Sequence, residues 1–340
     1  MIMRNKVWIM YKRFISLFTI FAIIFSLVGC GNTNSISKKS FDKNAKLKIV
    51  TTIFPIYDIV KNIVGDDKES DIKMLVDSGI DMHSFNPTAE DLRLINECDI
   101  FIYVGGESDD WAKRAVRGDD NLSKKSVSLM VELPHICKEE DDDMSKHYGL
   151  KEYKLENDEH IWMSPSNVFE ITNALKAKIC SLNSDKEKIY EENTKKFIDA
   201  IVLLDDGYED MRAHIKKDTI IVADRFPFKY LCVDYRIKYF SAFSGCSAES
   251  EASFEKITSL ANNVDDYDLN YVFIIEGNNN KIANTVIENT KKKNAKILTL
   301  DSMQSVTAKD IKNGASYLSI MEKNLLALKE GLEYDDETSD

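Results

Sequence analysis

Residues 47–64, LKIVTTIFPIYDIVKNIV, decide the fold class of this chain. The apolar run at 47–53 is rich in β-branched residues and is typical of a buried strand. Phe54-Pro55 follow at once, and proline is well placed in the first turn of a helix, where its missing N–H removes no hydrogen bond. The stretch therefore predicts a strand that leads directly into a helix.

The same alternation continues along the chain. Six further apolar runs bounded by turn residues predict strands, with amphipathic helical stretches between them. They lie at 72–76, 100–104, 220–223, 235–240, 272–275 and 297–300. This alternation predicts an α/β protein with mainly parallel sheets.

A weak internal repeat indicates two equivalent halves. Phe226-Pro227 repeat the arrangement of Phe54-Pro55 after a predicted strand, again with proline in the first turn of the next helix. A predicted strand ends in glycine 51 residues after each phenylalanine, at Gly105 and Gly277, so both matches share an offset of 172. We therefore expect two similar lobes.

Residues 184–215, between the two halves, contain almost no helix breakers. Their apolar side chains recur at steps of seven, then four and three, and so form one stripe on a helix. The stripe consists of Tyr190, Phe197, Ile201, Leu204, Tyr208, Met211 and Ile215. A helix of this length would extend about 48 Å, and Gly207 would cost it about 1 kcal/mol relative to alanine. We predict one long helix between the lobes; the alternative is two shorter helices with a turn at 205–207.

The composition is that of a globular protein with roughly two domains. Of 340 residues, 44% are hydrophobic and 30% are charged, and the formal net charge is −12. The first thirty residues carry four basic side chains and no acidic one, so the remainder has a net charge of −16. Such an acidic body repels phosphate backbones, which argues against nucleic acid as a partner and favours a protein that handles cations.

The amino terminus is typical of an export signal. Residues 1–13 are basic, and the run at 14–28, FISLFTIFAIIFSLV, is apolar but shorter than the about 20 residues that cross a bilayer. The run ends in Leu-Val-Gly before Cys30, which resembles the lipobox of bacterial lipoproteins, whose cysteine is lipidated and becomes the mature first residue. We predict a signal peptide at 1–30, a flexible tether at 31–45, and a lipid anchor on the extracytoplasmic face of a bacterial cell membrane. The alternative is an uncleaved anchor helix.

Several common functional motifs are absent from the sequence. It contains no Gly-rich phosphate-binding loop and no Gly-x-Ser-x-Gly hydrolase elbow. The five cysteines beyond Cys30 include no Cys-x-x-Cys pair, which argues against a disulfide framework or a zinc ribbon, although one bridge stays open. The acidic segment at 138–159, with His135 just before it and His147 within it, is either a mobile loop or a weak collector of cations.

Two of the five histidines lie where α/β sheets place ligands. His83 follows the predicted strand at 72–76 and precedes a helix that Thr88 and Asp91 would cap. His160, in the stretch DEHIWMSP, also lies just ahead of a helical segment. Loops at the carboxyl ends of strands are the usual ligand sites of open α/β sheets. Each histidine taken singly has a structural alternative, but together they suggest a site.

These motifs resemble the cluster 9 (A-I) solute-binding lipoproteins, the zinc and manganese receptors of bacterial ABC importers. The resemblance covers about 46–332 and rests on TTIFPIYDIVKNIVGD, HSFNPTAEDLRLINECDIFIYVG, HIWMSPSN, FKYLCVDY and the final SYLSIMEKNLLALKEGL. It implies two α/β lobes joined by one long rigid helix, with the metal in the cleft between the lobes and with His83 and His160 as ligands. The lobes would be 46–183 and 216–335, with the helix at 184–215.

The resemblance also implies two ligands from the second lobe. Asp301, in LTLDSMQSV, matches the family's aspartate after the last strand; its alternative role is a helix N-cap. The position that usually holds a histidine or glutamate is Arg225 here, and a guanidinium has no lone pair for a metal. We therefore predict that Asp224 takes that place. Glu249 and Glu276 are candidates for orienting the ligands, with a solvated carboxylate as the alternative for each.

The predicted function is a receptor that binds zinc and delivers it to an ABC permease driven by a cytoplasmic ATPase. Two imidazoles and two carboxylates suit zinc and manganese alike, so a manganese or iron receptor is the alternative within the family. An exported metal-dependent hydrolase is the alternative from another class, but the sequence lacks a base motif such as His-Glu-x-x-His, and we expect no enzyme. A surface adhesin also stays open. We expect a monomer.

Overall fold

The computed structural model describes residues 40–335 apart from 81, 139–156, 244 and 246–250. The predicted signal peptide with Cys30, most of the predicted tether, and Glu249 lie outside these residues. None of the described helices is both long and apolar enough to cross a membrane. No disulfide joins Cys98, Cys137, Cys180 and Cys232, the cysteines that the structure describes.

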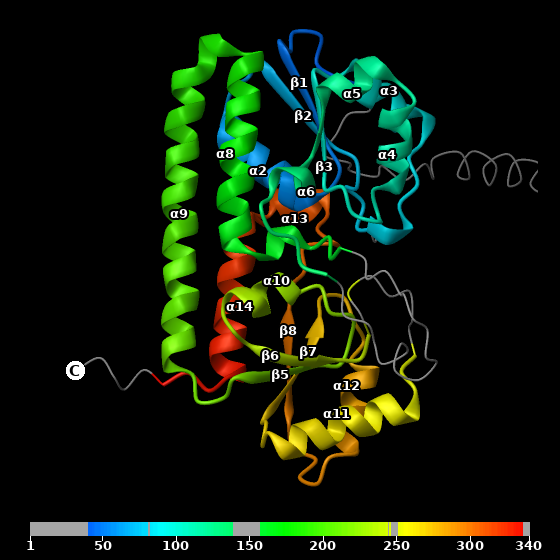
Figure 1. Ribbon diagram of the computed structural model, residues 1–340, viewed down its shortest axis with the longest axis vertical. Helices are drawn as coiled ribbons and strands as arrows, with labels where there is room; N and C mark the ends of the chain where they lie inside the picture. Colours follow the sequence, from blue (N-terminus) through cyan, green and yellow to red (C-terminus); the bar gives the residue numbers. More distant parts are fainter. Residues whose placement is uncertain (1–39, 81, 139–156, 244, 246–250, 336–340) are drawn as a thin grey trace, which may run out of the picture. The chain divides into compact units, whose positions relative to one another are not determined.

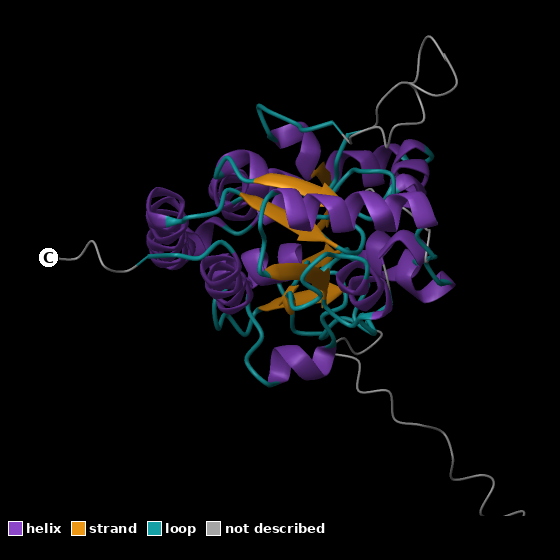
Figure 2. Cartoon of the chain, turned by 90° about the horizontal axis from the view of Figure 1, so that it is seen from below, coloured by secondary structure: helices purple, strands orange, loops and turns teal. Residues whose placement is uncertain are grey.

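The first lobe is built on four parallel strands in the order β2-β1-β3-β4. The strands are β1 (Leu47–Thr51), β2 (Ser70–Met74), β3 (Ile100–Tyr103) and β4 (Ser126–Ser128). Its helices are α2 (Phe54–Val64), α3 (Ala89–Glu97), α4 (Asp110–Arg117), α5 (Asp120–Lys125), α6 (Leu129–Glu132) and α8 (Pro165–Leu182), with 3-10 turns η1 (Met82–Ser84) and η2 (Ile161–Met163). In Figure 2 the helices cover the strands on both sides, as parallel sheets require.

The second lobe repeats this plan, with parallel strands in the order β6-β5-β7-β8. The strands are β5 (Thr219–Val222), β6 (Lys238–Ser241), β7 (Tyr271–Ile275) and β8 (Lys296–Leu300). Its helices are α10 (Lys229–Asp234), α11 (Phe254–Asp266) and α12 (Lys281–Glu288). The chain then passes through α13 (Ala308–Lys312), where the Ala308 N–H donates to Asp77 O of the first lobe at 3.1 Å, and returns along α14 (Tyr317–Gly331). Gly105 and Gly277 lie two residues beyond the ends of β3 and β7, with φ of 98° and 77°, a left-handed conformation that favours glycine. The predicted two-lobed α/β fold is confirmed.

One continuous helix, α9 (Glu187–His214), follows the 3-10 turn η3 (Ser184–Lys186) and packs against α2 and α8 of the first lobe and α14 of the second. Figure 1 shows α9 passing beside both lobes. The alternative of two shorter helices is wrong, because the helix runs unbroken through Gly207. A Cβ at that position would lie 3.0 Å from Leu325 Cδ2, so the glycine lets α14 approach closely.

Local signals in the sequence place some elements correctly and others not. Proline does lie in the first turn of α2, and Thr88 and Asp91 form the predicted capping box of α3. The same prediction for Pro227 is wrong, because α10 begins only at Lys229, after the N-cap residue Phe228. The strand predicted at 235–240 begins at Lys238, and β4 was not predicted because Ser-Val-Ser carries no apolar run.

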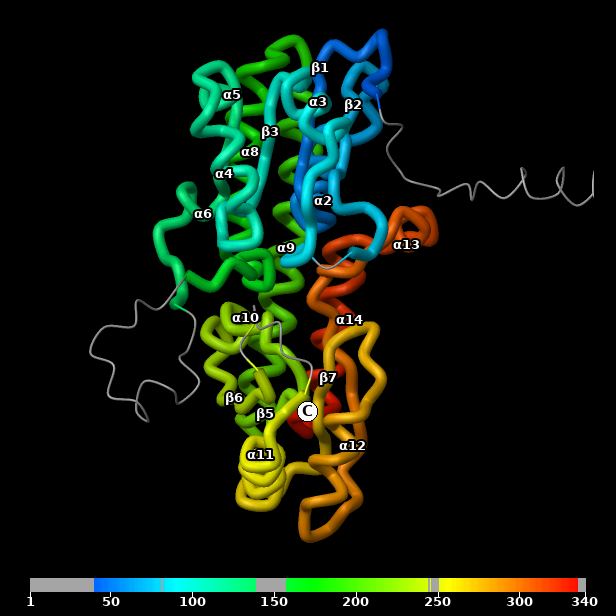
Figure 3. The backbone as a smooth tube through the Cα atoms, turned by 90° about the vertical axis from the view of Figure 1, so that its right-hand side faces the viewer, coloured from blue at the N-terminus to red at the C-terminus, as the bar shows by residue number. Residues whose placement is uncertain are grey.

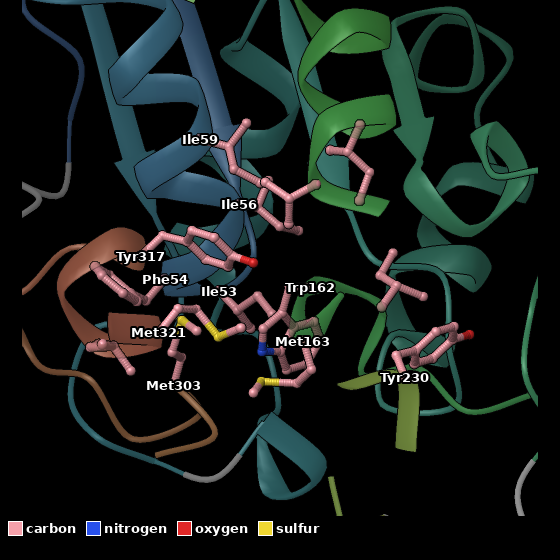
Figure 4. Close-up of a cluster of buried hydrophobic side chains, with 14 of the residues drawn as sticks. Ile53, Phe54, Ile56, Ile59, Trp162, Met163, Tyr230, Met303, Tyr317 and Met321 are labelled. Atoms are coloured by element: carbon pink, nitrogen blue, oxygen red, sulfur yellow. The ribbon is translucent and has the colours of Figure 1, made fainter. Parts of the chain in front are cut away.

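The main apolar core continues from the first lobe into the second. Figure 4 shows Phe54 and Trp162 of the first lobe packed beside Met303, Tyr317 and Met321. Figure 3 shows that α14 runs from beside α13 into the second lobe. Since packed cores resist continuous deformation, this shared core and α9 together favour a rigid connection between the lobes.

Candidate metal centre

The structure brings His83 and His160 together. His83 lies in the η1 turn after β2, and His160 directly precedes η2. Their ring centroids are 5.8 Å apart, and the planes are inclined by 57°. A tetrahedral zinc with Zn–N bonds of about 2.0–2.1 Å would place two imidazole centroids about 5 Å apart. The two rings therefore lie close to the separation that one shared ion requires.

His160 is fully buried and is held by Asp158 from its own loop. The Asp158 carboxylate accepts hydrogen bonds from the His160 backbone N–H at 2.9 Å and from the ring at Nδ1, 3.0 Å away. Asp158 is itself fixed by its neighbours: its N–H donates to Cys137 O, and its carbonyl accepts from the Tyr230 hydroxyl. A carboxylate at Nδ1 orients the ring and leaves Nε2 as the metal-binding atom, the usual arrangement of a ligand histidine.

His83 meets a second carboxylate. Its Nδ1 lies 2.7 Å from Ser108 Oγ and 3.2 Å from Glu159 Oε1, and the Glu159 side chain has no exposed surface. Burial by itself would raise the pKa of Glu159. The hydrogen bond from His83, the charges of His160 and His83, and the Ser108 hydroxyl outweigh burial and lower that pKa to about 2. These contacts therefore favour the ionised form of Glu159.

Asp224 lies just after β5, and the hydrogen bonds of its carboxylate are to residues of its own lobe. It is 4% exposed, and Oδ1 accepts from Arg225 N at 2.9 Å. Oδ2 accepts from the Asn278 side-chain amide and, at 3.4 Å, from Ile275 N. These contacts tie the ends of β5 and β7 together, and none of them joins Asp224 to either histidine.

Asp301 follows β8 in a tight turn. Its Oδ1 accepts from Met303 N at 2.8 Å, so the carboxylate supports this turn and does not cap a helix, since α13 begins only at Ala308. Glu276, at the end of β7, accepts from Ser302 N at 2.8 Å and from the Ser302 hydroxyl at 2.6 Å. Burial, and then the charge of Asp301, raise the pKa of Glu276 to about 7, and burial also raises the pKa of Asp301. Two half-buried carboxylates that repel one another are stabilised by a nearby cation.

Two contacts connect loops of the second lobe to the surroundings of His160. Trp162, whose ring lies 5.3 Å from that of His160, donates from Nε1 to the carbonyl of Ser302 at 2.9 Å, and Ser302 is the residue after Asp301. On another side, a Cβ at Gly245 would lie 3.0 Å from His160 Cε1 and 2.9 Å from the Phe226 carbonyl. Loops that follow β5, β6 and β8 therefore all approach His160, directly or through one residue.

The four predicted ligands do not form a completed cluster. Within residues 40–335, leaving aside the undescribed gaps, no group of three or more His, Cys, Asp or Glu side chains is arranged to hold a metal ion. The structure joins His83 to His160, while ligation by Asp224 and Asp301 stays a prediction. His214, the last residue of α9, is half-buried and lies 3.1 Å from Asp210 Oδ1 beside the Tyr334 ring.

Sequence reasoning missed the partners of the two histidines. Asp158 and Glu159 immediately precede His160, and this Asp-Glu-His run was the available signal. Acidic residues in a loop otherwise rich in carboxylates gave no reason to single them out. Ser108 carried no signal, since its approach to His83 depends on how two separate loops fold together.

Comparisons with known proteins point to one family. The family model described as "Zinc-uptake complex component A periplasmic" (ZnuA) matches residues 49–331. The chain is 30% identical over 310 residues to the zinc-binding lipoprotein AdcA of Streptococcus pneumoniae, covering 89% of this chain and 58% of AdcA. It is 27% identical over 326 residues to the high-affinity zinc uptake system protein ZnuA of Bacillus subtilis, covering 95% of this chain and 99% of that protein.

A solved structure shows the same likeness. The crystal structure of the Zn(II)-bound ZnuA-like domain of S. pneumoniae AdcA matches with a TM-score of 0.67 and 25% identity. The match covers 85% of this chain and all of that domain. The chain thus spans a little over half the length of AdcA, and the domain that it resembles is the ZnuA-like one.

Proposed function

The chain belongs to the ZnuA family of zinc-uptake complex components, and on that premise we propose that it is an extracytoplasmic receptor that binds zinc and delivers it to an ABC importer. The relatives carry zinc in their names, and the matching crystal structure is that of a zinc-bound domain. Zinc is the cargo of such a receptor, and we expect no catalytic activity.

The observation that carries the proposal is the pair of imidazoles, of which His160 is fully buried and His83 is 16% exposed. They lie 5.8 Å apart, and each has a carboxylate at Nδ1, Glu159 for His83 and Asp158 for His160. Zinc binds neutral imidazole nitrogens, and ligand histidines characteristically donate their other N–H to a carboxylate. Two such rings on adjoining loops therefore fit half of a tetrahedral zinc site.

We propose that Asp301 and Asp224 supply the second half. Asp301 uses Oδ1 for its turn, and the charge of the neighbouring half-buried Glu276 favours a cation beside these two carboxylates. Asp224 would have to exchange part of its hydrogen bonding to Asn278 for the metal. Glu276 would then orient the Asp301 turn through Ser302. Carboxylates also suit manganese, so a manganese or iron receptor is the alternative within the family.

The proposed partners and location follow from family membership. Zinc taken up by the receptor would pass to a membrane permease coupled to a cytoplasmic ATPase. We propose that Cys30 carries the lipid anchor and that the receptor works as a monomer. Cys30→Ala should move the chain from the membrane fraction into the soluble fraction; equal membrane retention would reject the anchor.

Zinc titration of the full chain purified in detergent tests the proposal. A competing chelator should report one tightly bound zinc, and His160→Ala should weaken its affinity by at least about 100-fold, since a ligand is lost. His135→Ala is the matched control because His135 is exposed and outside the pair. Absence of stoichiometric zinc, or equal affinities for the two variants, would contradict the proposal.

A further inference from the structure

The Glu159 side chain packs against the backbone of Gly106 so closely that only glycine fits at this position. A Cβ at Gly106 would lie 2.0 Å from Glu159 Oε2 and 2.2 Å from Glu159 Cβ, far inside van der Waals contact. Gly106 is not among the residues with positive φ, so its backbone does not require glycine. The position therefore needs glycine for the space that it leaves to Glu159.

Ser108 links this carboxylate to His83. The backbone N–H of Ser108 donates to Glu159 Oε2 at 3.0 Å, and its hydroxyl donates to Oε1. The same hydroxyl oxygen lies 2.7 Å from His83 Nδ1. Both oxygens of Glu159 accept hydrogen bonds from Ser108, and a serine hydroxyl has one hydrogen to donate. Because that hydrogen points to Glu159, the contact with His83 must use a proton on Nδ1.

These contacts determine which ring nitrogen of His83 carries the proton and which carries the lone pair. A neutral imidazole carries its proton on one nitrogen and its lone pair on the other. With the proton on Nδ1, the lone pair is on Nε2. All three segments, the η1 turn, the loop at 105–109 and the loop at 158–160, belong to the first lobe, so the second lobe is not needed for this arrangement.

We propose that Glu159 is a positioning residue that acts through Ser108 and holds His83 as the Nδ1–H tautomer, so that the lone pair for the metal is on Nε2. The close packing of Glu159 against Gly106 keeps the carboxylate in place. The inference rests on the proposed function as a metal receptor. It goes beyond the predicted ligands in assigning a role to three residues that are not ligands. The two imidazoles of the first lobe are then already oriented for the metal before the ion binds, and the second lobe completes the site.

The tautomer is measured on the metal-free full chain by long-range ¹H–¹⁵N spectra of the histidine rings, with His83→Asn to assign the signal. The wild-type protein should show His83 protonated at Nδ1. In Glu159→Gln the amide oxygen keeps the hydrogen bond from the Ser108 N–H, so the amide nitrogen takes the Oε1 position and donates to the Ser108 hydroxyl. That hydroxyl would then donate to Nδ1, so His83 should change to the Nε2–H form. A wild-type His83 in the Nε2–H form, or an unchanged tautomer in Glu159→Gln, would overturn the proposal. Because no metal is present, this result does not depend on zinc binding.

Zinc affinity supplies the second readout. Loss of a group that orients a ligand histidine typically weakens metal binding about 10–100-fold, and we expect this for Glu159→Gln. Gly106→Ala keeps the carboxylate but displaces it, so it should show a loss of the same order. Gly118→Ala is the matched control, because a Cβ there meets only ordinary contacts at 3.6 Å, and it should bind zinc like the wild type.

The outcomes are distinct. Wild-type affinity, within about twofold, in both Glu159→Gln and a folded Gly106→Ala would overturn the proposal. A loss in Glu159→Gln as large as that of His83→Ala, with the tautomer unchanged, would also overturn it, because Glu159 would then be a ligand. Failure of the wild-type chain to bind zinc would reject the proposed function and leave the tautomer measurement to decide the role of Glu159.

Discussion

Replacing Asp58 by asparagine should stabilise the protein at neutral pH. Asp58 lies on α2, is 8% exposed, and accepts a hydrogen bond at 2.9 Å from the N–H of Tyr317, the first residue of α14. Burial raises the pKa of Asp58 from 3.8 to about 6, although the Tyr317 N–H and the Asn62 amide act in the opposite direction. The ionised carboxylate is therefore the less favourable form in the folded protein.

The sign and size of the effect follow from proton linkage. Between pH 3.8 and about 6 the folded state holds a proton on Asp58 that the unfolded state has lost. The stabilisation from this proton is complete below the unfolded pKa and disappears as the pH rises through the folded value. A pKa difference of about two units, at about 1.4 kcal/mol each, makes the ionised form less stable by about 3 kcal/mol above pH 7.

Urea unfolding of the metal-free full chain from pH 4 to 8 measures the difference. Asp58→Asn keeps an acceptor for the Tyr317 N–H and cannot ionise, so it should match the wild type near pH 4 and exceed its unfolding free energy by about 2–3 kcal/mol at pH 8. Asp58→Ala is the control, since it leaves the buried N–H without its acceptor and should lose about 1–3 kcal/mol at pH 4. An asparagine variant less stable than the wild type at pH 8 would refute the reasoning, because the charge would then stabilise the start of α14 more than burial disfavours it.

Further predictions concern the metal, the lobes and the packing. Asp224→Ala should weaken zinc far more than Arg225→Ala, because a guanidinium has no lone pair for a metal; equal losses in competition titrations, or a larger loss for Arg225, would make Asp224 the wrong ligand. The wild-type chain should bind zinc more tightly than manganese, and the reverse order in the same titrations would favour the manganese alternative. X-ray scattering profiles with and without zinc should nearly coincide, because α9 and a shared core connect the lobes; a marked compaction on loading would reject the rigid connection. Gly331→Ala should lose about 1–3 kcal/mol, because a Cβ there would lie 2.2 Å from the Phe273 ring, whereas Gly118→Ala should change stability by less than about 0.5 kcal/mol; equal thermal unfolding temperatures would show that the ring yields without cost.

The sequence by itself was sufficient where the signal is local. Apolar runs marked most strands, a stripe of apolar residues marked α9, and Thr88 with Asp91 marked the start of α3. The reason is that strand burial, helix periodicity and capping depend on residues within a few positions of one another. The two histidines could be selected because both lie in loops where such sheets bind ligands.

Only the tertiary structure decided which polar groups meet. Glu159 reaches Ser108 across 51 residues, Asp224 reaches Asn278 across 54, and Asp58 reaches Tyr317 across 259. No periodicity or spacing encodes such pairs, because they depend on how loops from different strands are brought to one edge. Local signals also failed where a turn intervened, as at Pro227, and where a strand was too short and polar to be noticed, as in β4. The sequence alone therefore determined the lobes, the long helix and the pair of histidines, whereas the orientation of His83 and the engagement of Asp224 follow from long-range packing, in which each hydrogen bond is made only after distant segments have folded together.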